Sequence, residues 1–137
     1  MAVGRFGRLR LADVVAPAVE LAREGVVLTR EAAYLHEILG DMLRFSPEAA
    51  AVYAPGGRLL GAGDRVRFPD LADTLDHLGD TGAASMRDGA LAAAITAHLA
   101  ATGGLVTPTD LREYQVIDRV PLRIDYRDVS LLINPPP

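Results

Sequence analysis

The chain has 137 residues, half of them hydrophobic, which is enough for about one core. Its 14 basic and 18 acidic residues give a net charge of −4, so the charge of the chain offers no general attraction for nucleic acid. The absence of Cys excludes disulfides and thiolate chemistry. The sequence has no run of about 18 apolar residues, so no membrane span is predicted. Residues 1–5 lack the apolar core of a secretion signal. The sequence fits a cytoplasmic location as well as a periplasmic or secreted one.

The first predicted helix is one-sided and stops at Gly25. Inside a helix, Pro17 would lose its hydrogen bond to the Asp13 carbonyl, so the regular part is expected to begin near Pro17. The residues expected to point inward recur at helical spacing: Val14, Val15, Ala18, Leu21 and Ala22.

A second helix is predicted after Thr29, whose hydroxyl can cap it. Gly40 weakens the interior by about 1 kcal/mol relative to Ala, so this helix is expected to bend or end early. Ser46-Pro47-Glu48 starts a short third helix, which Pro55-Gly56-Gly57 closes. The residues of the second helix expected to point inward are Ala32, Leu35, Ile38, Leu39 and Met42.

Turns and one or two extended pieces are predicted between residues 57 and 68. Pro69-Asp70 then opens a helix that ends near Gly79 or Gly82. Ser85 and Asp88 have the spacing of a capping box for the next helix. That helix ends at residues 103–104, and residues 107–110 start a last short one.

Beyond Tyr114 the hydrophobic period shortens from helical to alternating. Residues 122–126 alternate apolar and polar, and residues 129–133 are more fully apolar. They predict two strands joined by a turn at Arg127-Asp128. Because a strand pair is marginal alone in water, we expect it to belong to a larger sheet that covers residues 129–133 on both sides.

None of the three histidines, His36, His77 and His98, has a partner at metal-motif spacing, so each is interpreted as an ordinary surface or boundary residue. Ser85 is interpreted as a cap, because no base is near it in the pattern. Tyr114 and Tyr126 are expected to pack their rings against the core.

Two polar segments are weighed as ligand sites and set aside. Gly61-x-Gly63 lacks the third glycine and the strand and helix of a dinucleotide site. Residues 64–67, Asp-Arg-Val-Arg, could bind an anion, but two arginines beside acids are more often a solvated face.

Five phrases occur in the order in which the γ-glutamyltranspeptidase family carries them, and nearly the whole chain resembles the middle of that family. The phrases are Phe6-Gly7-Arg8-Leu9 with Ala16-Pro17-Ala18-Val19-Glu20-Leu21-Ala22-Arg23-Glu24-Gly25, then Gly63-Asp64, Pro69-Asp70-Leu71-Ala72, Gly103-Gly104-Leu105, and Thr109-Asp110-Leu111 with Tyr114. The final Pro135-Pro136-Pro137 resembles the family's Pro-Pro-Pro-Ser-Ser-Gly-Gly segment cut before its serines. The chain departs from the family at Ser85-Met86, at Arg67-Phe68 and at Asp128, where Gly is usual.

The resemblance implies an N-terminal-nucleophile hydrolase whose precursor cleaves itself. A Thr freed at the start of the small subunit then attacks the γ-glutamyl amide, with its own amino group as base. In the family this nucleophile lies downstream of the position matching Pro137, and the arginine that holds the substrate carboxylate lies upstream of Met1. No residue of this chain is therefore assigned a catalytic, cofactor-binding or metal-binding role, and no cofactor is expected.

The predicted fold class is mainly α (α+β), a fragment of an αββα sandwich. Residues 1–115 are expected to form a helical lobe of the large subunit, and residues 116–137 a strand pair of the central sheet. The expected partners are the rest of its own enzyme, a small γ-glutamyl substrate in that enzyme, and a second copy through self-association.

The preferred function is structural support within a γ-glutamyltransferase or glutathione hydrolase, and the chain alone is expected to be inactive. One alternative is a related acylase of the cephalosporin acylase type. The other is a free-standing helical interaction module.

Overall fold

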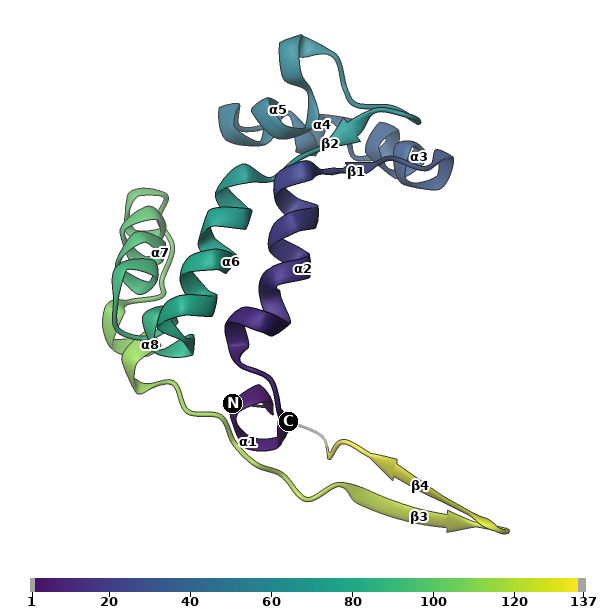
Figure 1. Cartoon of the computed structure of the whole chain (residues 1–137), viewed down its shortest axis with the longest axis vertical. Helices are drawn as coiled ribbons and strands as arrows, with labels where there is room; N and C mark the ends of the chain where they lie inside the picture. Colours follow the sequence, from purple (N-terminus) through teal and green to yellow (C-terminus); the bar gives the residue numbers. More distant parts are fainter. Residues whose placement is uncertain (1, 136–137) are drawn as a thin grey trace.

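Residues 2–135, described by a computed structural model, form a curved row of helices that ends in a β-hairpin (Figure 1). This confirms the prediction of a mainly helical α+β fold. The Pro135-Pro136-Pro137 motif extends outside the described residues. The elements in chain order are α1 (Ala2–Phe6), α2 (Leu11–Glu24), β1 (Val26–Val27), α3 (Arg30–Ile38), α4 (Gly40–Leu43), α5 (Pro47–Tyr53), η1 (Pro55–Gly57), β2 (Arg65–Val66), α6 (Pro69–Thr81), η2 (Ala83–Met86), α7 (Ala90–Ala101), α8 (Pro108–Glu113), β3 (Leu122–Tyr126) and β4 (Val129–Ile133).

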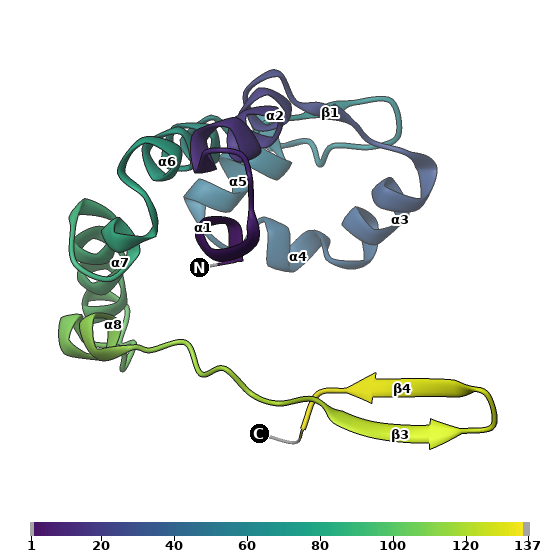
Figure 2. The ribbon, with the colours of Figure 1, turned by 60° about the horizontal axis from the view of Figure 1, so that its bottom comes forward.

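Helices α2 and α6 lie side by side in opposite directions and make the main helix pair (Figures 1 and 2). Val19, Ala22 and Ala72 are buried between them, and Ala72 is 0% exposed. Gly79 lets the helices approach closely, because a Cβ there would lie 3.0 Å from Cγ2 of Val15. Small residues therefore set the spacing of this pair.

The predicted start of α2 is wrong, because the helix begins at Leu11 and runs through Pro17. Pro17 has no N–H to donate to the carbonyl of Asp13, which costs one helical hydrogen bond. The turn before Pro17 packs against α6, where a Cβ on Gly79 would lie 3.1 Å from Cα of Ala12. Packing against α6 outweighs the missing bond. The predicted stop at residue 25 is confirmed.

The second predicted helix bends early, as expected from Gly40: α3 ends at Ile38 and α4 begins at Gly40. The Thr29 side chain caps α3 by accepting a hydrogen bond from the Ala32 N–H at 3.2 Å. Likewise Ser46 caps α5, accepting from the Ala49 N–H at 3.2 Å, which confirms that predicted start.

Large apolar side chains predicted to point inward are instead exposed in several places. In α2, Val14 and Leu21 are exposed. In α3 and α4 the small residues Ala33 and Gly40 are buried, and the large ones face outward. The predicted residues that are exposed are Leu35, Ile38, Leu39 and Met42, and Tyr34 and Phe45 are exposed beside them.

A second, smaller core lies where β1 pairs with β2. Leu28, Leu60 and Val66 are buried there, with Phe68 packed against both cores. Strand β1 was not predicted, since two residues are too short to show an alternating pattern. The strands are antiparallel, with Val26 opposite Val66.

The predicted capping box at Ser85 is wrong. Helix α7 begins at Ala90 after Gly89, and Ser85 lies in the preceding 3₁₀ turn, where its Oγ donates to the Gly82 carbonyl at 3.0 Å. A Cβ on Gly89 would lie 3.1 Å from Cα of Ser85, so the turn folds back on itself. By contrast, a true capping box joins Thr107 and Asp110 at the start of α8.

Candidate functional site

Every residue of strands β3 and β4 is exposed. The strands pair antiparallel as predicted, with Leu122 opposite Ile133 and Ile124 opposite Leu131. In Figure 2 the hairpin stands apart from the helices, joined to α8 by an extended segment. Within residues 2–135 each strand has one neighbour, so the outer edge of each has no strand paired to it there.

The pairing sorts the side chains of the hairpin by face, because neighbours along a strand point to opposite sides. One face is wholly apolar, and all of its members are about half exposed. They are Leu122, Ile124, Tyr126, Val129, Leu131 and Ile133. On the other face, Leu132 is the one large apolar side chain beside Arg123, Asp125 and Ser130. The hairpin is therefore apolar mainly on one face. The expectation that residues 129–133 are covered on both sides thus applies mainly to that face.

The second face of the hairpin carries a polar cluster. Ser130 and Arg123 both donate to the Asp125 carboxylate, Arg123 through Nε at 3.0 Å. These bonds, from Ser130 first and Arg123 second, lower the pKa of Asp125. Arg123 also donates to Ser130 Oγ at 2.9 Å. Because the cluster is exposed, it fixes the local register more than it adds stability.

The hairpin turns at Arg127-Asp128, as predicted. Arg127 adopts the left-handed conformation at φ 53°, one residue before Asp128, where the family usually carries Gly. The Arg127 guanidinium lies 5.1 Å from the centre of the Tyr126 ring, which holds it over that ring. The prediction that Tyr114 and Tyr126 pack into the core is wrong for the described chain, because they are 64% and 58% exposed.

A groove of about 600 Å³ lies between α5 and the start of α6. Arg65 and Arg67 line it, but both donate to carbonyls at the end of α2: Arg65 to Gly25 at 2.6 Å and Arg67 to Glu24 at 3.1 Å. Cations at a helix C-terminus stabilise its partial negative charge. The arginines thus serve α2, and nothing in this arrangement points to a bound anion.

The turn at residues 61–64 is tied by one carboxylate. Asp64 accepts from the Gly61 N–H at 2.8 Å and from Arg58 Nη1 at 2.7 Å. The Arg58 bond, followed by the Gly61 bond, lowers the pKa of Asp64 to about 2. Gly63 takes φ 86° within this turn. Gly61 and Gly63 therefore belong to a turn that the hydrogen bonds of the Asp64 carboxylate hold together.

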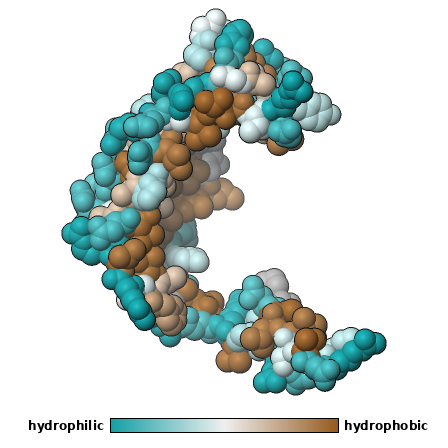
Figure 3. All heavy atoms as spheres, turned by 45° about the vertical axis from the view of Figure 1, so that its right-hand side comes forward, coloured by the Kyte–Doolittle hydropathy of each residue, from teal (hydrophilic) through white to brown (hydrophobic). Residues whose placement is uncertain are grey.

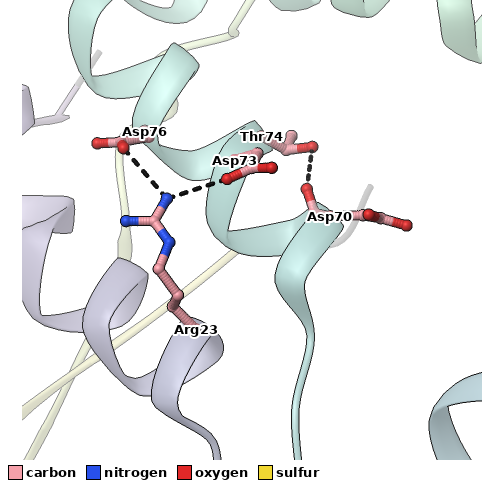
Figure 4. A network of polar contacts seen from close by, with 5 residues as sticks. All are labelled: Arg23, Asp70, Asp73, Thr74 and Asp76. Carbon is pink, nitrogen blue, oxygen red and sulfur yellow. Dashed lines mark hydrogen bonds and ion pairs between the residues drawn. The ribbon is translucent and has the colours of Figure 1, made fainter.

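A polar clamp joins α2 to α6 (Figure 4). Arg23 Nη2 donates to Asp73 at 3.0 Å and to Asp76 at 3.3 Å, while Thr74 donates to the Asp70 carbonyl at 2.8 Å. The carboxylates, Asp73 first, raise the pKa of Arg23. The pairs are solvent-exposed, so they add little to stability beyond orienting the two helices.

The structure places the three histidines on three different helices. His36 Nδ1 lies 3.3 Å from the Leu60 carbonyl oxygen and its ring meets Tyr53 edge-on at 5.5 Å. His77 is in α6 and His98 in α7. Within residues 2–135 no three His, Asp or Glu side chains are grouped so that they could hold a metal ion. The same residues include no helix long and apolar enough to span a membrane.

The sequence pattern of the family described as "Gamma-glutamyltranspeptidase" matches residues 1–137. The chain belongs to the γ-glutamyltranspeptidase family. The solved structures of a γ-glutamyltranspeptidase and a cephalosporin acylase to which the chain is similar confirm the expectation of a fold from the N-terminal-nucleophile hydrolases. The chain is similar over 98% of its length to the solved Helicobacter pylori gamma-glutamyltranspeptidase, with a TM-score of 0.91 and 25% identity, and covers 39% of that chain.

Two curated relatives of this chain are named for different activities, one as an acylase and one as a glutathione hydrolase. The acylase ACY 1 proenzyme of Pseudomonas sp. (strain SE83) is 38% identical over an alignment of 140 residues that covers 99% of this chain and 24% of the relative. The glutathione hydrolase proenzyme of Escherichia coli (strain K12) is 30% identical over an alignment of 138 residues that covers 100% of this chain and 24% of the relative. The chain thus spans about a quarter of the length of these relatives.

Proposed function

We propose that this chain supports the structure of a γ-glutamyltransferase or glutathione hydrolase whose chemistry lies in the rest of the polypeptide. The observation that carries the proposal is the family match over residues 1–137. Residues 1–115 would be the helical lobe, and residues 116–137 would contribute two strands to the central sheet.

The proposed chemistry is nucleophilic catalysis at a Thr outside this chain. Its hydroxyl attacks the γ-glutamyl amide, and its own amino group takes the proton. The C–N bond of the amide breaks, and the amine leaves with that proton. The resulting γ-glutamyl-enzyme is resolved by water or by an acceptor amine. In support, the best-placed hydroxyl of the sequence, Ser85, has its Oγ bonded to the Gly82 carbonyl within a turn.

The proposed role of the hairpin rests on its exposed apolar face. Six large apolar side chains of β3 and β4 lie on one side, and both outer edges lack a paired strand within the described chain. Such a surface is costly in water and is covered when the strands join a larger sheet. The remaining three quarters of the length of the relatives could supply that sheet.

A related acylase is a second candidate function. It is favoured by the identity to the acylase ACY 1 proenzyme, 38%, which exceeds the 30% to the glutathione hydrolase proenzyme of Escherichia coli. The acyl pocket, like the nucleophile, is proposed to lie outside this chain.

A substrate comparison on the intact, processed enzyme tests the proposal. We expect faster turnover of a γ-glutamyl anilide than of the side-chain amide of a cephalosporin, and a γ-glutamyl group on the N-terminal Thr of the small subunit by mass spectrometry. Exclusive turnover of the cephalosporin would favour the acylase. A labelled residue within this chain would refute the assignment of the nucleophile.

A further inference from the structure

An apolar surface lies on α3, α4 and the turn after α4, outside the two cores. Its exposed side chains recur every three or four residues, which on a helix places them on one face. Backbone hydrogen bonds carry the helical pattern across the bend, from the Leu39 N–H to the Leu35 carbonyl at 3.0 Å and from the Leu43 N–H to the Leu39 carbonyl at 2.9 Å. We call this set of side chains the α3–α4 face: Tyr34, Leu35, Ile38, Leu39, Met42 and Phe45.

The α3–α4 face is large enough to be a contact surface. Phe45 is 90% exposed and Tyr34 63%. At about 150–250 Å² for a whole aromatic side chain and less for an aliphatic one, the six side chains expose roughly 600 Å². Monomeric proteins rarely expose contiguous apolar patches larger than a few hundred Å², whereas a stable interface buries about 800 Å² on each partner.

The two ends of the face have complementary shapes. At one end lies a shallow hollow of about 410 Å³, lined by Arg30, Glu31, Tyr34 and Leu35. At the other end the Phe45 ring stands in the open. A second copy related by a two-fold axis near Ile38 would place its Phe45 in the hollow of the first copy, and would receive the Phe45 of the first copy in return.

The charges on the face are complementary in the same arrangement. Glu31 lies at the hollow, and Arg44 precedes Phe45 in the chain. The two-fold axis brings Arg44 of the second copy toward Glu31 of the first, and Arg30 of the first toward the Phe45 ring of the second. An exposed ion pair and a cation over a ring each add little stability, but together they fix the register of the two copies.

We infer that the α3–α4 face is the interface of a two-fold dimer of the intact enzyme, in which a second copy of this chain covers it. This goes beyond the proposed function, which concerns a single copy. The self-complementary shape and charge of the face, together with its area, argue for this occupant.

The position of the face agrees with this occupant. Figure 1 shows α3, α4 and α5 at one end of the curved row, and α1 and the hairpin at the other. Since α1 and β4 are the first and last elements of the described chain, further polypeptide of the longer relatives would join it at the end away from the face. Figure 3 shows that the hairpin carries hydrophobic side chains of its own, and the rest of the same polypeptide is their proposed cover.

The area of the face also sets the expected affinity. Interfaces that bury about 1,200 Å² in total are at the weak end of specific contacts, so we expect a dissociation constant of about 100 µM. Most copies are then monomers at tens of micromolar. A covalent trap is therefore the suitable readout.

Cysteine trapping in the intact, processed enzyme tests the dimer. The chain has no Cys, so Ile38→Cys adds a single thiol to it, close to the proposed axis. Two such thiols meet only if their Cα atoms come within about 7 Å, and diamide then takes up the two electrons and two protons that disulfide formation releases. The control is Leu21→Cys in α2, because Leu21 is 59% exposed and Ile38 is 60% exposed.

We expect Ile38→Cys to give about 10-fold more disulfide-linked dimer than Leu21→Cys, with residue 38 joined to residue 38 in the mass spectrum of the digested dimer. Adding Phe45→Ala to Ile38→Cys empties the hollow and should reduce the linked dimer about 5-fold or more. A yield that Phe45→Ala leaves unchanged would overturn the inference.

The reactivity of the thiol separates the two ways in which trapping can fail. A Cys at position 38 that reacts with a thiol reagent but forms no linked dimer would show that the face is free. A Cys that reacts only after unfolding would show that the rest of the polypeptide covers the face. Either result would overturn the inference. None of these measurements uses turnover, so failure of the proposed γ-glutamyl chemistry would leave their outcome standing.

Discussion

Replacing Gly25 with Ala should destabilise the helical lobe more than any other glycine substitution in a loop. Gly25 ends α2 at φ 84° and ψ 165°, a region that only Gly adopts readily. A Cβ there would collide with the Val66 carbonyl oxygen and lie 2.5 Å from Cγ of Arg67. Val66 pairs with Val26 in the short sheet, so its backbone cannot retreat without breaking that pair.

The magnitude follows from two costs. A non-Gly residue in such a conformation costs about 1–3 kcal/mol. The steric conflict with packed backbone adds about 1–3 kcal/mol. Against a total stability of about 5–15 kcal/mol for a small domain, the sum of about 2–6 kcal/mol threatens the fold.

Gly63 provides the matched control, because it has φ 86° and nothing within 4 Å of its Cβ position. Gly63→Ala should therefore show the conformational cost alone. Urea unfolding followed by far-ultraviolet circular dichroism gives the free energy of unfolding of each variant. If Gly25→Ala costs no more than Gly63→Ala, the close approach of α2 to β2 is not as described.

Three further predictions address charge, chemistry and assembly. Asp64→Asn should lower stability at neutral pH. Because the pKa of Asp64 is lowered to about 2 in the folded state, its carboxylate stabilises the fold above the unfolded pKa of about 4, and this stabilisation is lost as the pH falls toward 2. If the difference in urea midpoint between variant and wild type is as large at pH 2 as at neutral pH, the role of Arg58 is contradicted. Replacing each of the three histidines with Gln should leave turnover of the intact enzyme within a few-fold, whereas a loss of about 10³ would reveal a missed general base. The isolated chain should self-associate through its hairpin, and Leu131→Lys with Ile133→Lys should give a monomer of the chain but block maturation of the intact precursor. Sedimentation checks the first part, and a wild-type chain that stays monomeric at tens of micromolar would refute it.

Local signals predicted most of the elements, because capping and turn residues act on their neighbours. Thr29, Ser46 and Thr107 each cap the helix that follows, and the alternating pattern of residues 122–133 forms a hairpin. The failures came from contacts distant in sequence. Packing of Ala12 against Gly79 carries α2 past Pro17, which no local rule anticipates.

The wrong prediction of which side of α3 is buried had a different cause. Spacing alone cannot tell which side of α3 meets the lobe, since both sides are apolar: Ala33 and Gly40 are small, and Leu35 and Ile38 are large. The structure buries the small side. Likewise, the turn between β3 and β4 places its left-handed residue at Arg127, which residue preferences would have assigned to Asp128.

The central claim is that this chain supports an enzyme whose chemistry lies outside it. The most direct test measures chromophore release from a γ-glutamyl anilide by the isolated 137-residue chain and by the intact, processed enzyme at equal concentration. The account predicts turnover by the intact enzyme and none above the uncatalysed rate by the chain. Turnover by the isolated chain would contradict the claim, and absence of turnover by both would favour an acylase or a free-standing interaction module.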